Sequence, residues 1–254
     1  MRKTFAILLF LGLYSNLNAE SVFSLDWKKD IPLSALAIGL TVTSLFTDTL
    51  PDQIPHSLSR SDVNAFDRPF MFTRLNTPVR YTATTMMITM AAVLPVLPVL
   101  DNFNMNTLFT YGVMYSQATL LAYGTRDLIR NPITRFRPYL HDGRELRAED
   151  RHDSFPSGHT CVAFMSATFF TTTFLLEHPN SRWKWPGIIG SYTLATCIGA
   201  MRVISGMHFL TDVLAGAAIG SFYGWVIPIV HKRQDNNNFA VNLTGNGFLV
   251  SLSI

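Results

Sequence analysis

Residues 160–176 have the sequence TCVAFMSATFFTTTFLL and contain no Asp, Glu, Lys or Arg. A helix of this kind is long enough to cross a bilayer, because a membrane span needs about 17–25 mostly apolar residues. Five more runs without these four residue types occur along the chain, at 31–47, 81–100, 102–125, 185–201 and 213–230. Their number and lengths predict an all-α fold, a polytopic membrane bundle of about six helices.

The overall composition agrees with this fold class. The 254 residues are 48% hydrophobic and 15% charged, whereas soluble domains average about 25% charged. The formal net charge of +3 provides no basic face for nucleic acid, and the apolar content excludes a disordered chain. Because the runs are rich in Thr, Ser and Tyr and several are short, a soluble protein with long buried helices is the alternative.

The two ends of the chain lie outside the six runs and have sequence patterns of their own. A basic start precedes a short apolar stretch, and residues 1–19 end on Ala19, as in a secretory signal peptide. An uncleaved N-terminal anchor is the alternative. We expect residues 20–233 to form one membrane-embedded domain. The tail, 234–254, alternates apolar and polar residues around Gly-Asn-Gly, which predicts a small β-hairpin.

Polar residues gather in three places, the first of which is Arg130-Asn131-Pro132-Ile133-Thr134-Arg135-Phe136-Arg137-Pro138. The planar guanidinium group holds phosphate with two parallel donors, and the two prolines stiffen the loop that carries it. Arg130 and Arg137 are therefore candidate phosphate ligands. The alternative is a basic loop that only anchors a membrane helix.

The second group, Phe155-Pro156-Ser157-Gly158-His159, directly precedes the run 160–176. Pro-Ser-Gly before a long apolar run predicts a helix start, where free backbone N–H groups and the positive end of the helix dipole favour an anion. Gly158 allows the backbone to approach that anion closely. His159 is then expected in the first turn, beside the anion site. A histidine that only caps or packs the helix is the alternative.

The third group lies within residues 201–212 and contains Arg202, His208 and Asp212. The spacing predicts that Asp212 lies one helical turn from His208 on the same face. A carboxylate in that place can bind one imidazole nitrogen and leave the other free to attack. Ser205-Gly206 is expected to interrupt the chain before this helix, so that Arg202 reaches the same pocket. An exposed polar pair is the alternative.

Together the three groups resemble the motifs of the type 2 phosphatidic acid phosphatase superfamily, which includes bacterial lipid phosphatases, class A acid phosphatases and vanadium haloperoxidases. The family pattern is Lys, six residues and Arg-Pro, then Pro-Ser-Gly-His, then Ser-Arg, five residues, His, three residues and Asp. Its order and internal spacings hold here, and the resemblance spans residues 124–230. Arg130 stands in place of the family's lysine, and Met201 in place of the serine before Arg202.

The resemblance implies hydrolysis of a phosphomonoester or pyrophosphate through a phosphohistidine, with no metal and no cofactor. His208 would be the nucleophile, Asp212 would orient it, and His159 would protonate the leaving oxygen and then activate water. The phosphoryl oxygens would be held by five residues: Arg130, Arg137, Ser157, Gly158 and Arg202.

An active site at the ends of membrane helices faces the lipid headgroups. The expected substrate is therefore a membrane lipid phosphate, such as phosphatidic acid, phosphatidylglycerol phosphate, undecaprenyl pyrophosphate or lipid A, and the expected partner is the bilayer rather than nucleic acid. A soluble periplasmic class A acid phosphatase is the competing hypothesis, against which the runs 31–47 and 81–100 argue. A transporter or scaffold with phosphatase-like residues is a third hypothesis, although transporters usually place ionisable residues within their spans.

The basic residues bear on the orientation of the site. All three motifs and the loop 48–80 fall on one side of the predicted bundle. Basic residues on the other side are Lys28, Lys29, Arg182, Lys184, Lys232 and Arg233. The tendency of such residues to stay in the cytoplasm places the motifs in the periplasm, in the inner membrane of a bacterial cell. A cleaved signal followed by six complete spans gives the opposite orientation. The periplasmic orientation therefore requires one run not to cross completely, and we expect this run to be 31–47.

Overall fold

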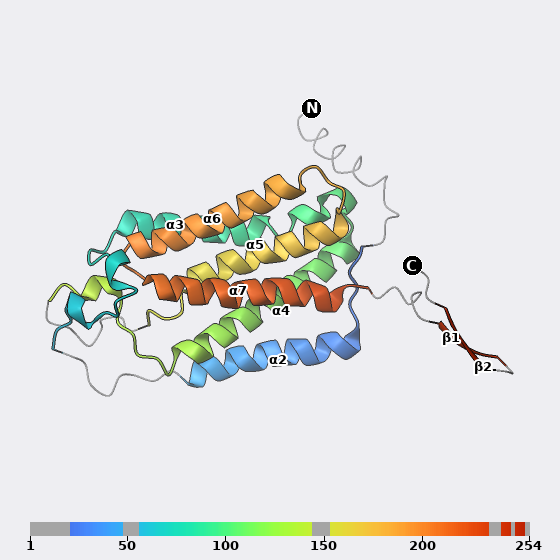
Figure 1. The fold of residues 1–254 in the computed structure, drawn as a ribbon, viewed down its shortest axis with the longest axis horizontal. Coiled ribbons are helices and arrows are strands. Elements are labelled where there is room, and N and C mark those ends of the chain that lie inside the picture. Colours follow the sequence, from blue (N-terminus) through green and yellow to red (C-terminus); the bar gives the residue numbers. More distant parts are fainter. Residues whose placement is uncertain (1–20, 48–55, 144–152, 234–239, 245–246, 252–254) are drawn as a thin grey trace, which may run out of the picture.

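The fold is a bundle of long helices, as the uncharged runs predict (Figure 1). The computed structural model describes residues 21–47, 56–143, 153–233, 240–244 and 247–251, so the predicted signal segment 1–19 lies outside the described residues. The α-helices of the described part are α2 (Trp27–Phe46), α3 (Thr77–Val93), α4 (Met105–Arg130), α5 (Gly158–Glu177), α6 (Lys184–Ile204) and α7 (Leu210–His231). Short 3-10 helices lie in the connections, at Arg60–Asp62, Arg68–Phe70, Leu97–Asn102 and Pro138–Leu140. The predicted all-α class is confirmed.

Asx residues begin three of these helices. The side chains of Asp26, Asn76 and Asn104 each accept a hydrogen bond from a backbone N–H in the first turn of α2, α3 and α4. Each cap satisfies a donor that has no partner within its helix and stabilises the helix start by about 0.5–2 kcal/mol.

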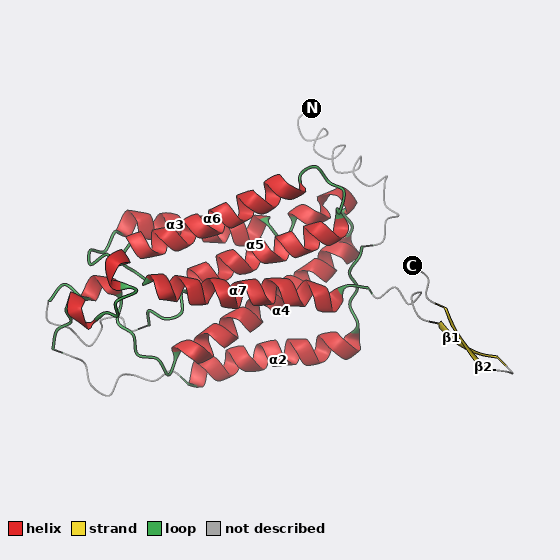
Figure 2. Cartoon of the chain, viewed as in Figure 1, coloured by secondary structure: helices red, strands yellow, loops and turns green. Residues whose placement is uncertain are grey.

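The centre of the bundle is α5, which packs against α3, α4, α6 and α7, while α2 packs mainly against α4 (Figure 2). The closest approach is between α5 and α7, where three glycines spaced four residues apart line α7. A Cβ atom at Gly220 would lie 2.0 Å from the carbonyl oxygen of Cys161, and one at Gly216 would lie 2.4 Å from that of Ser157. Only residues without a side chain allow two helix backbones to come this close. This contact holds the start of α7 against the start of α5, where two of the three motifs lie.

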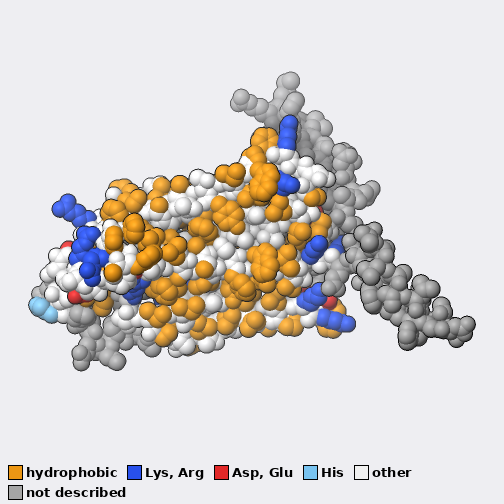
Figure 3. Space-filling model, in the orientation of Figure 1, with side chains coloured by type: hydrophobic (Ala, Val, Ile, Leu, Met, Phe, Trp, Pro, Cys, Tyr) orange, Lys and Arg blue, Asp and Glu red, His pale blue; other side chains and the backbone are white. Residues whose placement is uncertain are grey.

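The sides of the bundle are apolar and its ends are charged (Figure 3). Large apolar side chains on several helices face outward, among them Leu45, Ile189 and Trp225, which are 72%, 64% and 52% exposed. Soluble proteins rarely expose apolar surface on this scale. Five segments are long and apolar enough to cross a membrane: Trp27–Phe46, Thr77–Asp101, Gly158–Glu177, Lys184–Ile204 and Leu210–His231. These features indicate a multi-pass membrane protein rather than the soluble helical alternative.

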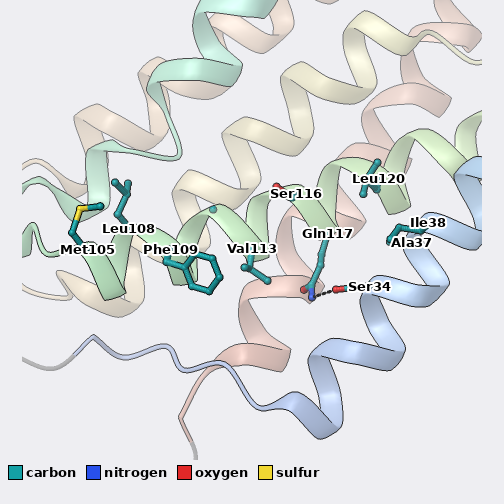
Figure 4. A pocket seen from close by; sticks show the side chains of 11 residues that line it. Ser34, Ala37, Ile38, Met105, Leu108, Phe109, Val113, Ser116, Gln117 and Leu120 are labelled. Carbon is teal, nitrogen blue, oxygen red and sulfur yellow. Dashed lines mark hydrogen bonds between the residues drawn. The ribbon is translucent and has the colours of Figure 1, made fainter.

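The run 102–125 is the exception among the six, because α4 is not among these five segments. The run 31–47, the one expected not to cross completely, lies in α2 except for its last residue, and α2 is long and apolar enough to cross. α4 is 26 residues long and ends with the charged residues Arg126, Asp127 and Arg130, and it carries Gln117 in its middle. Gln117 donates to Ser34 of α2, with 2.9 Å between Nε2 and Oγ, inside an apolar groove of about 600 Å³ between the two helices (Figure 4). None of the predicted site residues lines this groove.

The C-terminal tail contains the predicted hairpin. Strands β1 (Ala240–Thr244) and β2 (Gly247–Ser251) pair antiparallel, with Ala240 opposite Ser251 and Thr244 opposite Gly247. The hairpin follows α7 at the end of the bundle away from the three motifs (Figure 1).

Candidate active site

The three motifs meet in one cavity of about 380 Å³. It lies where α4 and α6 end and where α3, α5 and α7 begin, at the end of the bundle opposite the hairpin (Figure 1). Its lining residues are Arg80, Tyr81, Thr84, Tyr123, Arg126, Arg130, Arg137, Asp153, Gly158, His159, Arg202, Met207 and His208. Six of the eight predicted site residues are in this set, and Ser157 and Asp212 are not.

The first motif contributes both predicted arginines. Arg130 is in the last turn of α4, where its Nε and Nη2 atoms donate to the Asn131 side chain at 3.2 and 3.1 Å. Arg137 follows in the next connection and is 4% exposed. Its Nη2 atom forms an ion pair of 2.9 Å with Oδ1 of Asp153, which fixes the guanidinium group at the cavity wall.

The second motif forms the predicted helix start. α5 begins at Gly158 with Ser157 as its N-cap, and Gly158 and His159 face the cavity. The Ser157 side chain differs from the prediction, because its hydroxyl is fully buried and lies 3.0 Å from the hydroxyl of Thr160. Within the described residues, the second motif therefore presents backbone and imidazole to the cavity and not the serine hydroxyl.

The third motif spans the connection between α6 and α7. Arg202 is in the last turn of α6 and is 2% exposed. Gly206 has a φ of 73°, a left-handed conformation that glycine adopts without strain, and it reverses the chain at the predicted interruption. His208 then lies before α7, which begins at Leu210, so His208 and Asp212 are not one turn apart within a single helix as predicted.

The imidazole of His208 is held by a backbone carbonyl group. Its Nδ1 atom lies 2.7 Å from the carbonyl oxygen of Ser154, whereas the carboxylate of Asp212 is 3.6 Å away, too far for a hydrogen bond. This corrects the predicted direct contact with Asp212. Because a carbonyl oxygen only accepts, Nδ1 carries the proton and Nε2 carries the lone pair of the neutral ring. Complete burial lowers the pKa of His208 well below 6.5, and the nearby cations of Arg137 and Arg202 lower it further.

Ser154 lies between Asp212 and His208 and contacts both. One carboxylate oxygen, Oδ2, accepts from the Ser154 hydroxyl and from the backbone N–H of Phe209, and the other accepts from Arg135. Ser154 thus uses its side chain to reach Asp212 and its carbonyl group to reach His208. The predicted link between Asp212 and the imidazole therefore runs through an intervening residue, and the orienting role of Asp212 stays a prediction.

Arg135 connects this group to the loop before α3. Its guanidinium bridges Asp212 and Asp67, with 2.6 Å between Nη2 and the Asp67 carboxylate. Asp67 is fully buried and also accepts from Asn64 and from both the backbone N–H and the hydroxyl of Thr211. Burial raises the pKa of Asp67, but the hydrogen bonds from Thr211, Asn64 and Arg135 outweigh burial and hold that pKa below its usual value.

Several lining residues lie outside the predicted set. Arg126 is 8% exposed, donates from Nε to the carbonyl oxygen of Pro156 at 3.0 Å and packs against Gly158. Its position four residues before Arg130, on the same helical face, is a signal that could have identified it. The hydroxyl of Thr84, on α3, lies 2.9 Å from Nε2 of His159. No sequence motif marks Thr84 or its neighbour Arg80.

The cavity is strongly cationic. Five arginines and one carboxylate line it within the described residues, and a second carboxylate, Asp127, pairs with Arg126 and Arg130 beside it. A group of guanidinium donors around two imidazoles, with Arg126, Arg137 and Arg202 buried, is suited to a phosphoryl group, whose oxygens accept in several directions.

Comparison with known proteins points to the same superfamily as the three motifs. The sequence profile of the PAP2 superfamily matches residues 107–236. A lipid A 1-phosphatase from Porphyromonas gingivalis is 35% identical over 106 residues, which are 40% of this chain and 22% of that protein. Phosphatidylglycerophosphatase B from Bacillus subtilis is 31% identical over 107 residues, which are 40% of this chain and 50% of that protein.

A crystal structure of a transmembrane PAP2-type phosphatidylglycerolphosphate phosphatase from Bacillus subtilis is similar over 82% of this chain and 98% of that chain, with 19% identity and a TM-score of 0.45. The aligned regions of the two curated relatives span a fifth to a half of their lengths. The superfamily profile covers just over half of the 254 residues and includes all three motifs. The chain therefore belongs to the PAP2 superfamily.

Proposed function

We propose that this protein is a phosphatase that removes a phosphoryl group from a membrane lipid phosphate through a phosphohistidine, without a metal ion. The observation that carries the proposal is the placement of His159 and His208 in one cavity with Arg130, Arg137 and Arg202. The two imidazoles supply a nucleophile and an acid, and the guanidinium groups supply the positive charge that metal ions provide in other phosphoryl-transfer enzymes.

In the proposed reaction, Nε2 of His208 attacks phosphorus and the bond to the leaving oxygen breaks. His159 gives a proton to that oxygen. His159 then takes a proton from water, which attacks the phosphohistidine, breaks the N–P bond and releases inorganic phosphate. Asp212, through Ser154, keeps the Nδ1 atom of His208 protonated, so that Nε2 is the nitrogen that reacts.

The proposed substrate is a lipid because the cavity lies at the ends of apolar helices, at the level of the headgroups. The relatives named lipid A 1-phosphatase and phosphatidylglycerophosphatase B support the same class. We further propose that the site faces the periplasm from the inner membrane of a bacterial cell, as the basic residues at the other end of the bundle favour.

Phosphate release from purified protein in detergent tests the proposal. The panel contains lipid phosphates and one water-soluble phosphate ester. We expect release from lipid phosphates, a loss of about 10³-fold or more in His208→Ala, and no loss after treatment with EDTA. His56→Ala is the control, because His56 is exposed at the same end of the bundle and does not line the cavity. Full activity of His208→Ala, or loss of activity in EDTA, would contradict the proposed mechanism.

A further inference from the structure

One wall of the cavity comes from α3, which precedes the residues matched by the superfamily profile. Thr84 lies on this wall and connects it to His159. Its hydroxyl group donates to the carbonyl oxygen of Arg80 at 3.1 Å, so it accepts from Nε2 of His159 at 2.9 Å. Because His159 is the proposed donor of a proton to the leaving oxygen and contacts Thr84, the proposed reaction places the leaving group beside the α3 wall.

Arg80 is on the same wall. It precedes Thr84 by four residues, one helical turn, and its side chain lines the cavity. In the part of the chain that the structure describes, its guanidinium group forms no ion pair and no hydrogen bond, and its one ring contact is with Tyr81, 5.7 Å from Cζ to the ring centroid.

Three of the other four cavity arginines have carboxylate partners within the described residues. Arg126 and Arg130 pair with Asp127, and Arg137 pairs with Asp153. Arg80 is half-buried and has no such partner within the described residues, so its five N–H donors are available to a ligand in the proposed phosphate cavity. A neutral alcohol leaving group, such as diacylglycerol, would offer Arg80 no charge.

We propose that Arg80 binds a second anionic group, carried by the leaving group, so that the preferred substrates are lipid phosphates whose leaving group contains a phosphate of its own. This inference rests on the proposed phosphatase function and names its substrate class. A lipid diphosphate and a monophosphate on a phosphodiester-linked headgroup both meet this requirement. Arginine suits the role because its planar fork binds two phosphate oxygens at once.

The proposed reaction needs no reactant besides the lipid phosphate and water. With a lipid diphosphate, His208 attacks the outer phosphorus and the bond to the bridging oxygen breaks, with its electron pair going to the lipid monophosphate. His159 supplies the proton to that oxygen, and Arg80 binds the charge of the departing phosphate. Water then cleaves the phosphohistidine as before.

The test compares Arg80→Gln with wild type on four substrates in detergent micelles: farnesyl diphosphate, phosphatidylglycerol phosphate, farnesyl monophosphate and phosphatidic acid. Loss of one charge-assisted contact predicts a fall of about 10- to 100-fold in kcat/KM for the first two. For the last two we expect less than about 2-fold change, because the contact is absent. Arg74→Gln is the matched control, since Arg74 is exposed just before α3 and outside the cavity; it should change none of the four.

The outcomes separate the two proposals. Wild type inactive on the whole panel would refute the phosphatase function itself. If wild type is active and Arg80→Gln loses activity equally on all four substrates, Arg80 binds the reacting phosphoryl group. If Arg80→Gln loses no activity, Arg80 binds no part of the substrate. Either result would overturn the second-anion proposal. A selective loss on the diphosphate alone, or on phosphatidylglycerol phosphate alone, supports it and identifies which source of the second phosphate is used.

If the Arg80 variants do not fold, inhibition of the wild-type protein by two anions tests the same proposal. Methylenediphosphonate, which cannot be hydrolysed at its bridge, should inhibit about 10-fold more strongly than inorganic phosphate, because it occupies both anion positions. Arg80→Lys keeps the charge and should retain part of the difference. Equal inhibition by the two anions in wild type would overturn the proposal.

Discussion

At the residue scale, reactivity at His208 depends on which proton acceptor faces its ring. The carbonyl oxygen of Ser154 accepts from Nδ1 at 2.7 Å, and Arg137 and Arg202 approach the same ring from the cavity. The carbonyl group selects the tautomer, while the two cations and the burial oppose a charge on the ring. Both effects favour a neutral imidazole with its lone pair on Nε2.

This environment predicts the pH dependence. The pKa of His208 is lowered from 6.5, so as pH falls through 6.5 the ring stays neutral and nucleophilic. We expect the fall in kcat/KM that is caused by protonation of His208 to occur below pH 6.5. Arg137→Gln removes one of the cations and should move that fall to higher pH, toward 6.5, besides weakening phosphate binding.

The pH–rate profile of both proteins on one substrate checks this, because the second ionisation of the substrate phosphate, near pH 6, is common to both. A wild-type fall above pH 6.5, or a downward shift in Arg137→Gln, would contradict the prediction.

Asp67 is the second prediction at this scale. It does not line the cavity, yet it holds Arg135 against Asp212. Asp67→Asn removes a buried negative charge from this pair, and we expect a lower kcat with little change in KM, and a loss of about 1–3 kcal/mol in stability. Asp62→Asn is the control, since Asp62 is exposed in the same segment, lies outside the cavity and accepts from the backbone N–H of Ser59. Steady-state kinetics and thermal unfolding in detergent measure both effects, and an unchanged kcat would assign Asp67 to stability alone.

At the element scale, the position of the site depends on how closely α7 approaches α5. Gly216, Gly220 and Gly224 each face the α5 backbone, and the parallel course of the two helices brings the start of each to the same end. The His208 loop and the His159 turn are adjacent for this reason.

Gly220→Ala tests this contact. A Cβ there would lie 2.0 Å from the Cys161 carbonyl oxygen, so the helices must separate. We expect destabilisation by about 1–3 kcal/mol or more, as for overpacking in a core, together with loss of activity. Gly190→Ala in α6 is the control, because nothing lies within 4 Å of its added Cβ, and it should leave stability unchanged or slightly higher. Equal melting temperatures of the two variants in detergent would refute the importance of the glycine contact.

For the whole molecule, the fourth prediction concerns the side of the membrane on which the cavity lies. The proposed periplasmic site requires the other end of the bundle, including Lys232 and Arg233, to be cytoplasmic. A reporter that is active only after export, fused after Arg233, should therefore be inactive, and a cytoplasmic reporter at the same place should be active. Export of the fusion would reverse the orientation.

Features that depend on local patterns could be predicted from the amino-acid sequence. Runs without charge predicted the helices, because a span must exclude charged groups along its whole length, and three motifs with family spacing predicted the convergence of Arg130, Arg137, Gly158, His159, Arg202 and His208 that the cavity confirms. The catalytic roles of these residues stay predictions.

The contacts between distant segments could not be predicted in this way and are known from the folded chain. Ser154 stands between Asp212 and His208, Asp67 reaches Thr211 across 144 positions, and Thr84 reaches His159 across 75. The spacing of residues in a motif predicts which of them can lie on one helical face. It does not predict which residues of another element will contact them. That depends on the packing of α3, α5 and α7, which places Ser157 in the interior and Arg80 in the cavity.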